Sequence, residues 1–476
     1  MSNKFLTLVL MLGLTMGLFG QATVQVFNAD APGEGFNDPT PAAPVGGNPG
    51  TTIGQQRQIA FGYTAFLWGQ QLSSTQTIKV LAFFDPLGCT PTAATLGAAA
   101  PFWSFANRPA APGFPGLLSN TFYPAALAEK RTGVDITAQF PGNDFELFAF
   151  FNSNLGNPGC LDGAGWYYGL DNNPPPGKTN LVAVLLHEFG HGLGFTVGPT
   201  NANTGVRAAG IPSIWELSMK DLSTGKTWFT MTDIERAASA RNTNSLVWTG
   251  PSATAAAQQV LAPTPELVIS GPRSVRGQYE AQSASFGLPL SFTGLKDVLV
   301  PGFDGVGVST DGCEPLLTNG PNSVAGRVAL IDRGGCTFTQ KVKNAQDAGA
   351  IAVVIANNAP AGLPGMGGTD PSIIIPSIGV TQAVGQALRA LPQLSNPGRG
   401  GLPVELRLSA VFRSGLSGGF PRLYAPNPFQ QGSSVSHWDI TLTPNQLMEP
   451  FINLDLTQSL QPPQDLTFPL FQDIGW

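Results

Sequence analysis

Apolar side chains follow two different periods in the first part of the chain, and each period predicts a different kind of element. Residues 54–72 place aliphatic and aromatic side chains at roughly helical spacing. Residues 75–86 and 144–154 are runs rich in β-branched and aromatic residues, which are typical of strands. We therefore expect helix and sheet to be combined in this part of the chain.

A second helix is predicted after the breaker DNNPPPGK at residues 171–178. Thr179 follows this segment and is expected to cap the helix. The apolar faces of the helix are supplied by Leu181, Val184, Leu185 and Phe189. Gly192 and Gly194 then give the chain a place to leave the helix.

The pattern changes near Glu266, where strand-like alternation begins. Residues 328–331 and 351–355 are expected to be buried strands, and residues 338–350 between them have helical spacing. This strand, turn, helix and strand form a self-contained α/β unit. After residue 412 the chain is again rich in loops.

The N-terminus adds a segment that differs from both regions. Lys4 precedes an apolar run of fifteen residues, Phe5–Phe19, which is short for a membrane span and typical of a signal peptide. We expect cleavage near Ala22 and a secreted mature chain, with an uncleaved anchor as the alternative. No later stretch is long and apolar enough to span a membrane.

These changes of pattern predict two domains, one inserted into the other. The predicted segments are a signal peptide at 1–22, the first part of the main domain at 23–265, an inserted domain at 266–412 and the second part of the main domain at 413–476.

The composition narrows the function classes. Only 11% of the residues are charged, while the chain has 58 Gly and 42 Pro, so it is rich in turns. The net charge of −6 and the lack of any Lys/Arg run argue against a nucleic-acid surface.

The four cysteines are an even number in a chain expected to be exported, which suggests two disulfides. Three pairings are possible. Because Cys160 and Cys313 are far apart in the sequence, we favour Cys89–Cys160 and Cys313–Cys336.

The segment HEFGH holds two of only three histidines in the chain. The spacing of His187 and His191 places both imidazoles on one face of a helix, where they can bind a single metal ion. Glu188 lies beside the first histidine, where a carboxylate can accept a proton from a metal-bound water. The pattern predicts a catalytic zinc site that lacks its third protein ligand.

His437 is the favoured third ligand because it is the only other histidine and Gly194 permits the chain to turn away. Glu216 is the rival ligand. If Asp439 closed the site as a fourth ligand, the zinc would be structural, and the protein would be a secreted binding or adhesion protein. The sequence shows no clear calcium-binding loop, so it neither predicts nor excludes structural Ca²⁺.

The segments HEFGHGLGF, SHWD and LMEPF together resemble the metzincin zinc peptidases, specifically the leishmanolysin-like group. The compact metzincin pattern is broken here, because Val197 stands where the third histidine of HExxHxxGxxH would be. In the leishmanolysin-like group an insertion precedes that histidine. The resemblance therefore implies zinc ligands at His187, His191 and His437.

The same resemblance implies Glu188 as general base and Met448 as the residue of a methionine turn beneath the metal. The implied fold class is α+β, with a mixed sheet and an active-site helix interrupted by a small α/β domain. The implied activity is that of a zinc metalloendopeptidase acting on proteins or peptides. We expect the strand at 144–154 to pair with an extended substrate.

The inserted segment resembles the protease-associated (PA) domain over roughly residues 270–411, through GRVALIDRGGCTFTQKVKNAQDAGAIAVVIANN. Such domains carry no catalytic residues and would bind a substrate or a partner protein. Gly334 and Gly335 match no phosphate-binding loop and are interpreted as turn residues. Lys341 and Lys343 are expected on the solvated face of the helix.

Overall fold

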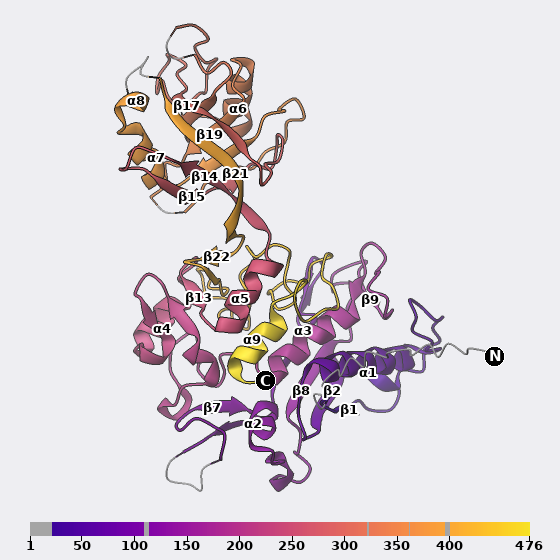
Figure 1. Ribbon diagram of the computed structural model, residues 1–476. Helices are drawn as coiled ribbons and strands as arrows, with labels where there is room; N and C mark the ends of the chain where they lie inside the picture. Colours follow the sequence, from indigo (N-terminus) through magenta and orange to yellow (C-terminus); the bar gives the residue numbers. More distant parts are fainter. Residues whose placement is uncertain (1–20, 109–113, 321–322, 361, 396–399) are drawn as a thin grey trace, which may run out of the picture. The chain divides into compact units, whose positions relative to one another are not determined.

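The computed structural model describes residues 21–108, 114–320, 323–360, 362–395 and 400–476. The predicted signal peptide, apart from Gln21 and Ala22, lies outside the described residues. The chain forms two compact units, the histidine unit (Met1–Val260 with Phe420–Trp476) and the insert unit (Leu261–Gly419), as Figure 1 shows. The insert unit thus begins and ends a few residues outside the expected range 266–412.

The histidine unit is built on a sheet of four strands in the order β1-β2-β8-β5. These strands are β1 (Val24–Asn28), β2 (Ile78–Asp85), β8 (Leu147–Asn152) and β5 (Gly97–Pro101). Strand β2 is parallel to both β1 and β8, whereas β5 is antiparallel to β8. The expected strand at 144–154 is therefore central, because β2 and β5 pair with its two sides. The prediction that it offers a free edge to a substrate is wrong, and β5 forms that edge of the sheet.

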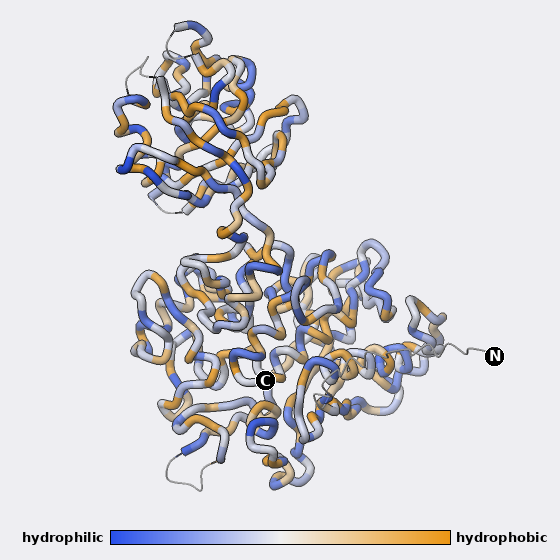
Figure 2. Tube along the Cα trace, viewed as in Figure 1, coloured by the Kyte–Doolittle hydropathy of each residue, from blue (hydrophilic) through white to orange (hydrophobic). Residues whose placement is uncertain are grey.

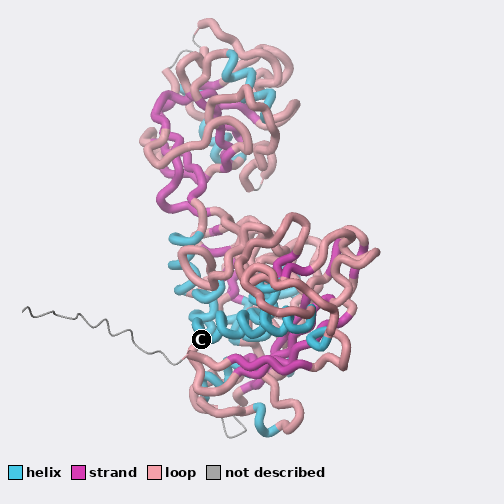
Figure 3. Tube along the Cα trace, turned by 90° about the vertical axis from the view of Figure 1, so that its right-hand side faces the viewer, coloured by secondary structure: helices cyan, strands magenta, loops and turns pink. Residues whose placement is uncertain are grey.

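Two long helices of the histidine unit lie along one another and against this sheet (Figure 3). Helix α1 (Ile53–Gln71) is capped by Thr52, whose side chain accepts the N–H of Gln55. Helix α3 (Leu181–Leu193) is buried along its whole length. The predicted cap at Thr179 is wrong by one residue, because Asn180 accepts the N–H groups of the first turn of α3.

Close packing of α3 on the sheet depends on a glycine. A Cβ added at Gly192 would lie 2.6 to 3.1 Å from three side-chain atoms of Leu147 on β8. The helix ends at Gly194, where φ of +130° is a conformation that favours glycine. The two glycines therefore fix how near the helix approaches the sheet and where the chain departs from it.

Shorter elements complete the histidine unit. Its other helices are α2 (Ala125–Thr132), α4 (Asp233–Ser239), α5 (Pro251–Val260) and α9 (Thr467–Ile474). Its other strands are β3 (Cys89–Thr90), β4 (Ala93–Ala94), β6 (Ser104–Ala106), β7 (Phe122–Pro124), β9 (Trp166–Tyr167), β10 (Thr179–Asn180), β11 (Met219–Asp221), β12 (Lys226–Thr227), β13 (Leu246–Trp248) and β23 (Phe420–Pro421). Short 3-10 turns are η1 (Gly35–Asn37), η2 (Thr137–Gln139), η3 (Ala208–Gly210), η4 (Ile214–Leu217) and η5 (Trp228–Thr230).

The insert unit has an eight-stranded sheet in the order β15-β14-β21-β17-β18-β19-β20-β16. The strands are β14 (Pro263–Ile269), β15 (Gly277–Glu280), β16 (Gln282–Ser283), β17 (Leu295–Pro301), β18 (Val328–Asp332), β19 (Ala352–Ala356), β20 (Ser377–Val380) and β21 (Leu402–Arg413), with β22 (Leu416–Ser417) outside the sheet. Its helices are α6 (Phe338–Asp347), α7 (Gln382–Arg389) and α8 (Pro392–Ser395).

The centre of this sheet is parallel, and the predicted strand, helix and strand unit is confirmed as β18, α6 and β19. Figure 2 shows hydrophobic positions along the chain within this unit. Strands β18 and β19 are mostly apolar and buried, and separate hydrophobic cores lie on the two sheet faces. Lys341 overturns one prediction. Its side chain is 0% exposed, because the ammonium turns inward to backbone carbonyls instead of facing water.

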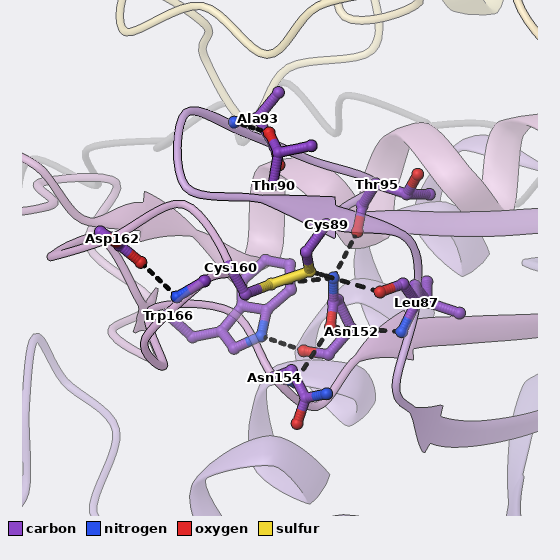
Figure 4. Close-up of a disulfide and its surroundings, with 11 residues drawn as sticks. Leu87, Cys89, Thr90, Ala93, Thr95, Asn152, Asn154, Cys160, Asp162 and Trp166 are labelled. Carbon is purple, nitrogen blue, oxygen red and sulfur yellow. Dashed lines mark hydrogen bonds between the residues drawn. A yellow bond between two sulfur atoms is a disulfide. The ribbon is translucent and has the colours of Figure 1, made fainter.

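The favoured cysteine pairing forms in the structure as Cys89–Cys160 and Cys313–Cys336. Figure 4 shows the first bridge beside Asn152, the last residue of β8. The Asn152 amide donates to Thr95 O at 2.8 Å and to Cys89 Sγ at 3.1 Å. Within the described part of the chain, no helix is both long and apolar enough to cross a membrane.

Candidate metal centre

The structure brings the three histidines of the chain together. His187 and His191 lie one turn apart on α3, and His437 comes from the loop after β23. The three Nε2 atoms form a nearly equilateral triangle with sides of 3.0, 3.1 and 3.2 Å. All three side chains are buried.

Each imidazole is fixed by a hydrogen bond from its other nitrogen to a backbone carbonyl. The Nδ1 atoms lie 2.7 Å from Leu447 O for His187, 2.8 Å from Phe195 O for His191, and 2.7 Å from Ser433 O for His437. A carbonyl only accepts, so each Nδ1 carries the proton and each Nε2 presents a lone pair.

Burial keeps the three rings neutral. It lowers the pKa of His187 to about 4 and the pKa of His191 to about 3. The pKa of His437 also falls well below its ordinary value, through burial and through the other two imidazoles. Three neutral rings therefore direct three lone pairs at one point, an arrangement that repels itself unless a cation is shared.

The triangle has the dimensions of a zinc site. Zinc binds imidazole nitrogen at about 2.0–2.1 Å with tetrahedral geometry, which separates the ligand nitrogens by about 3.3 Å. The observed separations of 3.0–3.2 Å are close to this value. Backbone carbonyls that orient the ligand histidines are also what metal sites require. The chemistry and spacing of the donors therefore fit zinc.

Glu188 follows the first histidine on α3 and is directed to strand β5, where its carboxylate accepts the backbone N–H of Ala99. Burial raises the pKa of this carboxyl to about 8, against the lowering effect of the Ala99 N–H. Gly97 allows this approach, because a Cβ there would lie 3.1 Å from Cγ of Glu188.

The three histidines and Glu188 line a cleft of about 900 Å³. Its lining includes residues 92–99, among them part of β5, together with residues 431–433, 436, 437 and 450–454. The backbone groups of Leu96 and Phe102 pair with β8. In an antiparallel ladder the pairing residues alternate, so Gly97 and Ala99 direct their backbone groups away from β8.

The two rival ligands do not join the cluster. Glu216 is buried in an ion pair with Arg207, with 2.7 Å between Nη2 and Oε2, and accepts the hydroxyl of Thr200. Asp439 instead accepts the N–H of Thr441 at 3.1 Å. Among the described residues, the group of possible ligands around His187 contains only the three histidines. The three-ligand arrangement leaves a tetrahedral ion one open position.

Met448 lies directly beneath α3, where a Cβ added at Gly190 would lie 2.7 Å from its Sδ. The neighbouring Leu447 is held from both sides. Its N–H donates to the Asp465 carboxylate at 2.7 Å, and its carbonyl accepts from His187. Sequence reasoning missed Asp465, because nothing local distinguishes it from other acids in loops.

A second group of carboxylates, Glu129, Asp135 and Glu146, lies within the histidine unit. Its oxygens already accept from Thr137 and from the backbone N–H of Lys79, and the Lys79 ammonium lies 3.6 Å from Asp135 Oδ2. We assign no cation to this group.

The insert unit matches the model of a known family. Residues 297–388 match the family model of the PA domain. The insert unit contains a PA domain. The match lies inside the predicted insert and covers β17 to α7.

The curated relatives share only a segment with this chain. "Receptor homology region, transmembrane domain- and RING domain-containing protein 1" of Oryza sativa is 37% identical over 111 residues, 21% of each chain. "Vacuolar-sorting receptor 7" of Arabidopsis thaliana is 32% identical over 135 residues, 26% of this chain and 21% of its own. "Leucine aminopeptidase 2" of Arthroderma otae is 40% identical over 81 residues, 17% of this chain and 16% of its own.

This chain thus spans about a fifth of the length of these relatives. Among solved structures, a zinc aminopeptidase from Bacillus subtilis is 22% identical and covers 33% of this chain and 35% of its own, with a TM-score of 0.22. A TM-score this low carries no argument. The comparisons show the PA domain, and the family of the histidine unit is left to be inferred from its site.

Proposed function

We propose that the protein is a secreted zinc-dependent endopeptidase whose active site lies in the histidine unit. The observation that carries the proposal is the convergence of three Nε2 lone pairs at 3.0–3.2 Å, each ring held by a backbone carbonyl. His187, His191 and His437 would hold the ion. The two disulfides and the predicted signal peptide support export.

Zinc bound at such a site supplies Lewis acidity, which lowers the pKa of a bound water and polarises a carbonyl. Glu188 acts as general base, accepting a proton on its carboxylate and delivering it to the leaving amine. Burial favours this role because it raises the proton affinity of the carboxylate. The three carbonyls behind the histidines keep the rings oriented throughout.

An extended peptide would bind along the free edge of β5. The outward backbone groups of Gly97 and the carbonyl of Ala99 are suited to pair with a strand added to the sheet, while the N–H of Ala99 is already bound by Glu188. The small side chains of β5, three of them alanine, would leave room for the residues of the substrate. Phe451 and Ile452, which line the same cleft, would provide apolar contacts for its side chains.

The charge of the cleft favours internal peptide bonds over the N-terminal bond. An aminopeptidase needs a carboxylate to bind the terminal ammonium of its substrate. Glu188 is the only acid among the residues that line the described cleft, and it is assigned to catalysis. The named aminopeptidase relatives match only about a sixth of this chain, so their specificity does not extend to this site.

We further propose that the histidine unit is leishmanolysin-like. Two features support this assignment: the long insertion between Gly194 and His437, and the contact of Met448 with α3 at Gly190, the residue before His191. The PA domain would then bind a protein substrate or a partner.

The deciding experiment compares wild type with Glu188→Gln. We expect the variant to retain one zinc per chain by elemental analysis and to lose cleavage of an unfolded protein substrate by at least about 100-fold. Glu34→Gln, a change at an exposed position of the same unit, serves as the matched control. Undiminished cleavage by Glu188→Gln would refute the catalytic assignment.

The same assay separates the alternative of a binding protein with structural zinc. In that case wild type would hold one zinc and show no proteolysis sensitive to a chelator. The three-ligand site argues against this alternative, since structural zinc is normally closed by four protein ligands.

A further inference from the structure

The disulfide of the insert unit lies against a buried ammonium. Lys341 on α6 is 0% exposed, and its Nζ donates to the backbone carbonyls of Asp311 and Gly334. Its third contact is Cys313 Sγ at 3.4 Å. An ammonium has three N–H donors, so all of them are used, one on a disulfide sulfur.

The contacts of Lys341 fit an ammonium, because three acceptors surround its Nζ and a neutral amine has only two N–H donors. Burial lowers the pKa of Lys341, and the carboxylates of Asp304, Asp311 and Asp332 oppose this effect without reversing it. The geometry therefore places a positive charge next to one sulfur of the bridge.

The two sulfurs of this disulfide have different surroundings. Cys313 Sγ is covered by Lys341 and by the backbone of Gly335, where an added Cβ would lie 2.8 Å from it. Gly335 has φ of +76°, so a glycine is favoured at this contact. Both cysteines are half-buried, and Cys336 lies between the exposed residues Gly335 and Thr337. Because the Lys341 ammonium lies beside Cys313 Sγ, Cys313 is the better leaving group when a thiolate attacks Cys336.

We propose that Cys313–Cys336 is a redox-sensitive modification site that reacts with small thiols such as glutathione. The attacking thiolate forms a bond to Cys336 Sγ, the Cys313–Cys336 bond breaks, and Cys313 leaves as a thiolate. One sulfur of the bridge is reduced while the attacking thiol is oxidised to the mixed disulfide. The Cys313 thiolate then accepts an N–H of Lys341 as a charge-assisted hydrogen bond. A stabilised leaving thiolate makes the exchange faster and the open form more populated.

The other disulfide is a matched control in the same chain. Cys89 and Cys160 lie near the neutral amide of Asn152, at 3.1 and 3.6 Å from its Nδ2 (Figure 4). A neutral donor stabilises a thiolate less than an ammonium does. Cys160 is 4% exposed, whereas Cys89 is half-buried like Cys336, so the two bridges differ chiefly in the donor that lies beside their sulfurs.

The first test treats the full chain with reduced glutathione at pH 7, alkylates at intervals and follows both bridges by mass spectrometry. We expect Cys313–Cys336 to open at least about tenfold faster than Cys89–Cys160, with glutathione attached to Cys336. Lys341→Met should slow the opening by about fivefold, and Lys341→Arg should restore part of the rate. Equal rates in wild type and Lys341→Met, or glutathione attached to Cys313, would overturn the proposal.

A second measurement needs no substitution, because Lys341→Met removes a buried ammonium and could unfold the domain. The pH dependence of iodoacetamide labelling is recorded for each cysteine of the reduced wild-type chain. Cys313 should titrate well below the ordinary thiol pKa of about 8.5, and Cys336 near it. If Cys313 titrates at or above that value, the ammonium does not stabilise the thiolate and the proposal is wrong.

Discussion

Helices α3 and α6 each bury groups that carry or attract charge, but only one of them leaves those groups open to a ligand. On α3, His187 and His191 direct unshared lone pairs into a cleft. On α6, all three donors of Lys341 are satisfied inside the insert unit. Burial of polar groups alone therefore does not identify a ligand site. A ligand site is identified by buried lone pairs or donors that face a cavity and are not satisfied by other protein groups.

The largest expected effect comes from removing the ligand that α3 does not supply. His437→Ala should weaken zinc binding by more than about 100-fold, because loss of even an outer partner of a zinc ligand costs 10- to 100-fold. Proteolysis should be lost with the metal. Zinc affinity is measured by competition with a chromogenic chelator.

The matched control is Lys343→Ala on α6, which removes an ammonium that pairs with Asp347 at the surface of the insert unit. It should leave the zinc affinity of the histidine unit unchanged. Equal zinc affinity in His437→Ala and wild type would show that the cluster of three rings is not the metal site, and the contrast between the helices would fail.

Residues close in sequence were predicted well. The spacing in HEFGH placed two imidazoles on one helix face, and apolar runs located β2, β8, β18 and β19. Such patterns are local, because a side chain's direction in a helix or strand follows from its position in the repeat. The prediction that His437 joins the two histidines of α3 rested on the scarcity of histidine and on a family resemblance.

The failures have a common physical cause. Position 144–154 was correctly predicted as a strand, but its place in the sheet depends on β5, whose alanines and glycine give no strong strand signal. Lys341 looked solvated because its helix has polar neighbours, whereas its burial is set by the distant carbonyl of Asp311. Contacts between backbone segments that are far apart in the sequence cannot be predicted from a local pattern of residues.

A medium effect on stability is expected when a glycine is replaced on a tightly packed helix and on a loosely packed one. Gly192→Ala should lower the free energy of unfolding by about 1–3 kcal/mol, because the new Cβ meets Leu147 at 2.6 to 3.1 Å, including its Cβ. Gly62→Ala on α1 is the matched control, since nothing lies within 4 Å of its added Cβ. The control should stabilise by about 0.5–1 kcal/mol through helix propensity. Urea unfolding of the zinc-saturated protein measures both, and stabilisation by both alanines would show that α3 is not packed closely on β8.

The smallest effect concerns the buried pair Glu129 and Glu146. This pair does not line the cleft, as the histidines do, and contains no ammonium like that of Lys341. Burial, together with the neighbouring Glu129, raises the pKa of Glu146 to about 8, and burial also raises that of Glu129. The other charged groups facing the pair are Asp135, Asp144 and Lys79. The folded state thus holds a proton that the unfolded chain releases near the ordinary value of 4.5. This contribution to stability is fully present below about pH 4.5 and is lost as the pH rises through about 8.

Glu129→Gln isolates that contribution. Its amide oxygen can still accept the N–H of Thr137, which now lies 2.8 Å from Glu129 Oε1, while its amide N–H replaces the shared proton with a donor that does not titrate. The fall in unfolding free energy between pH 5 and pH 8 should be shallower in the variant than in wild type. Other buried acids such as Asp465, whose pKa burial raises to about 6, titrate in both proteins and cancel in the difference. Identical slopes in urea titrations would mean that the pair holds no extra proton. A buried acidic pair would then be no more sensitive to pH than an exposed one.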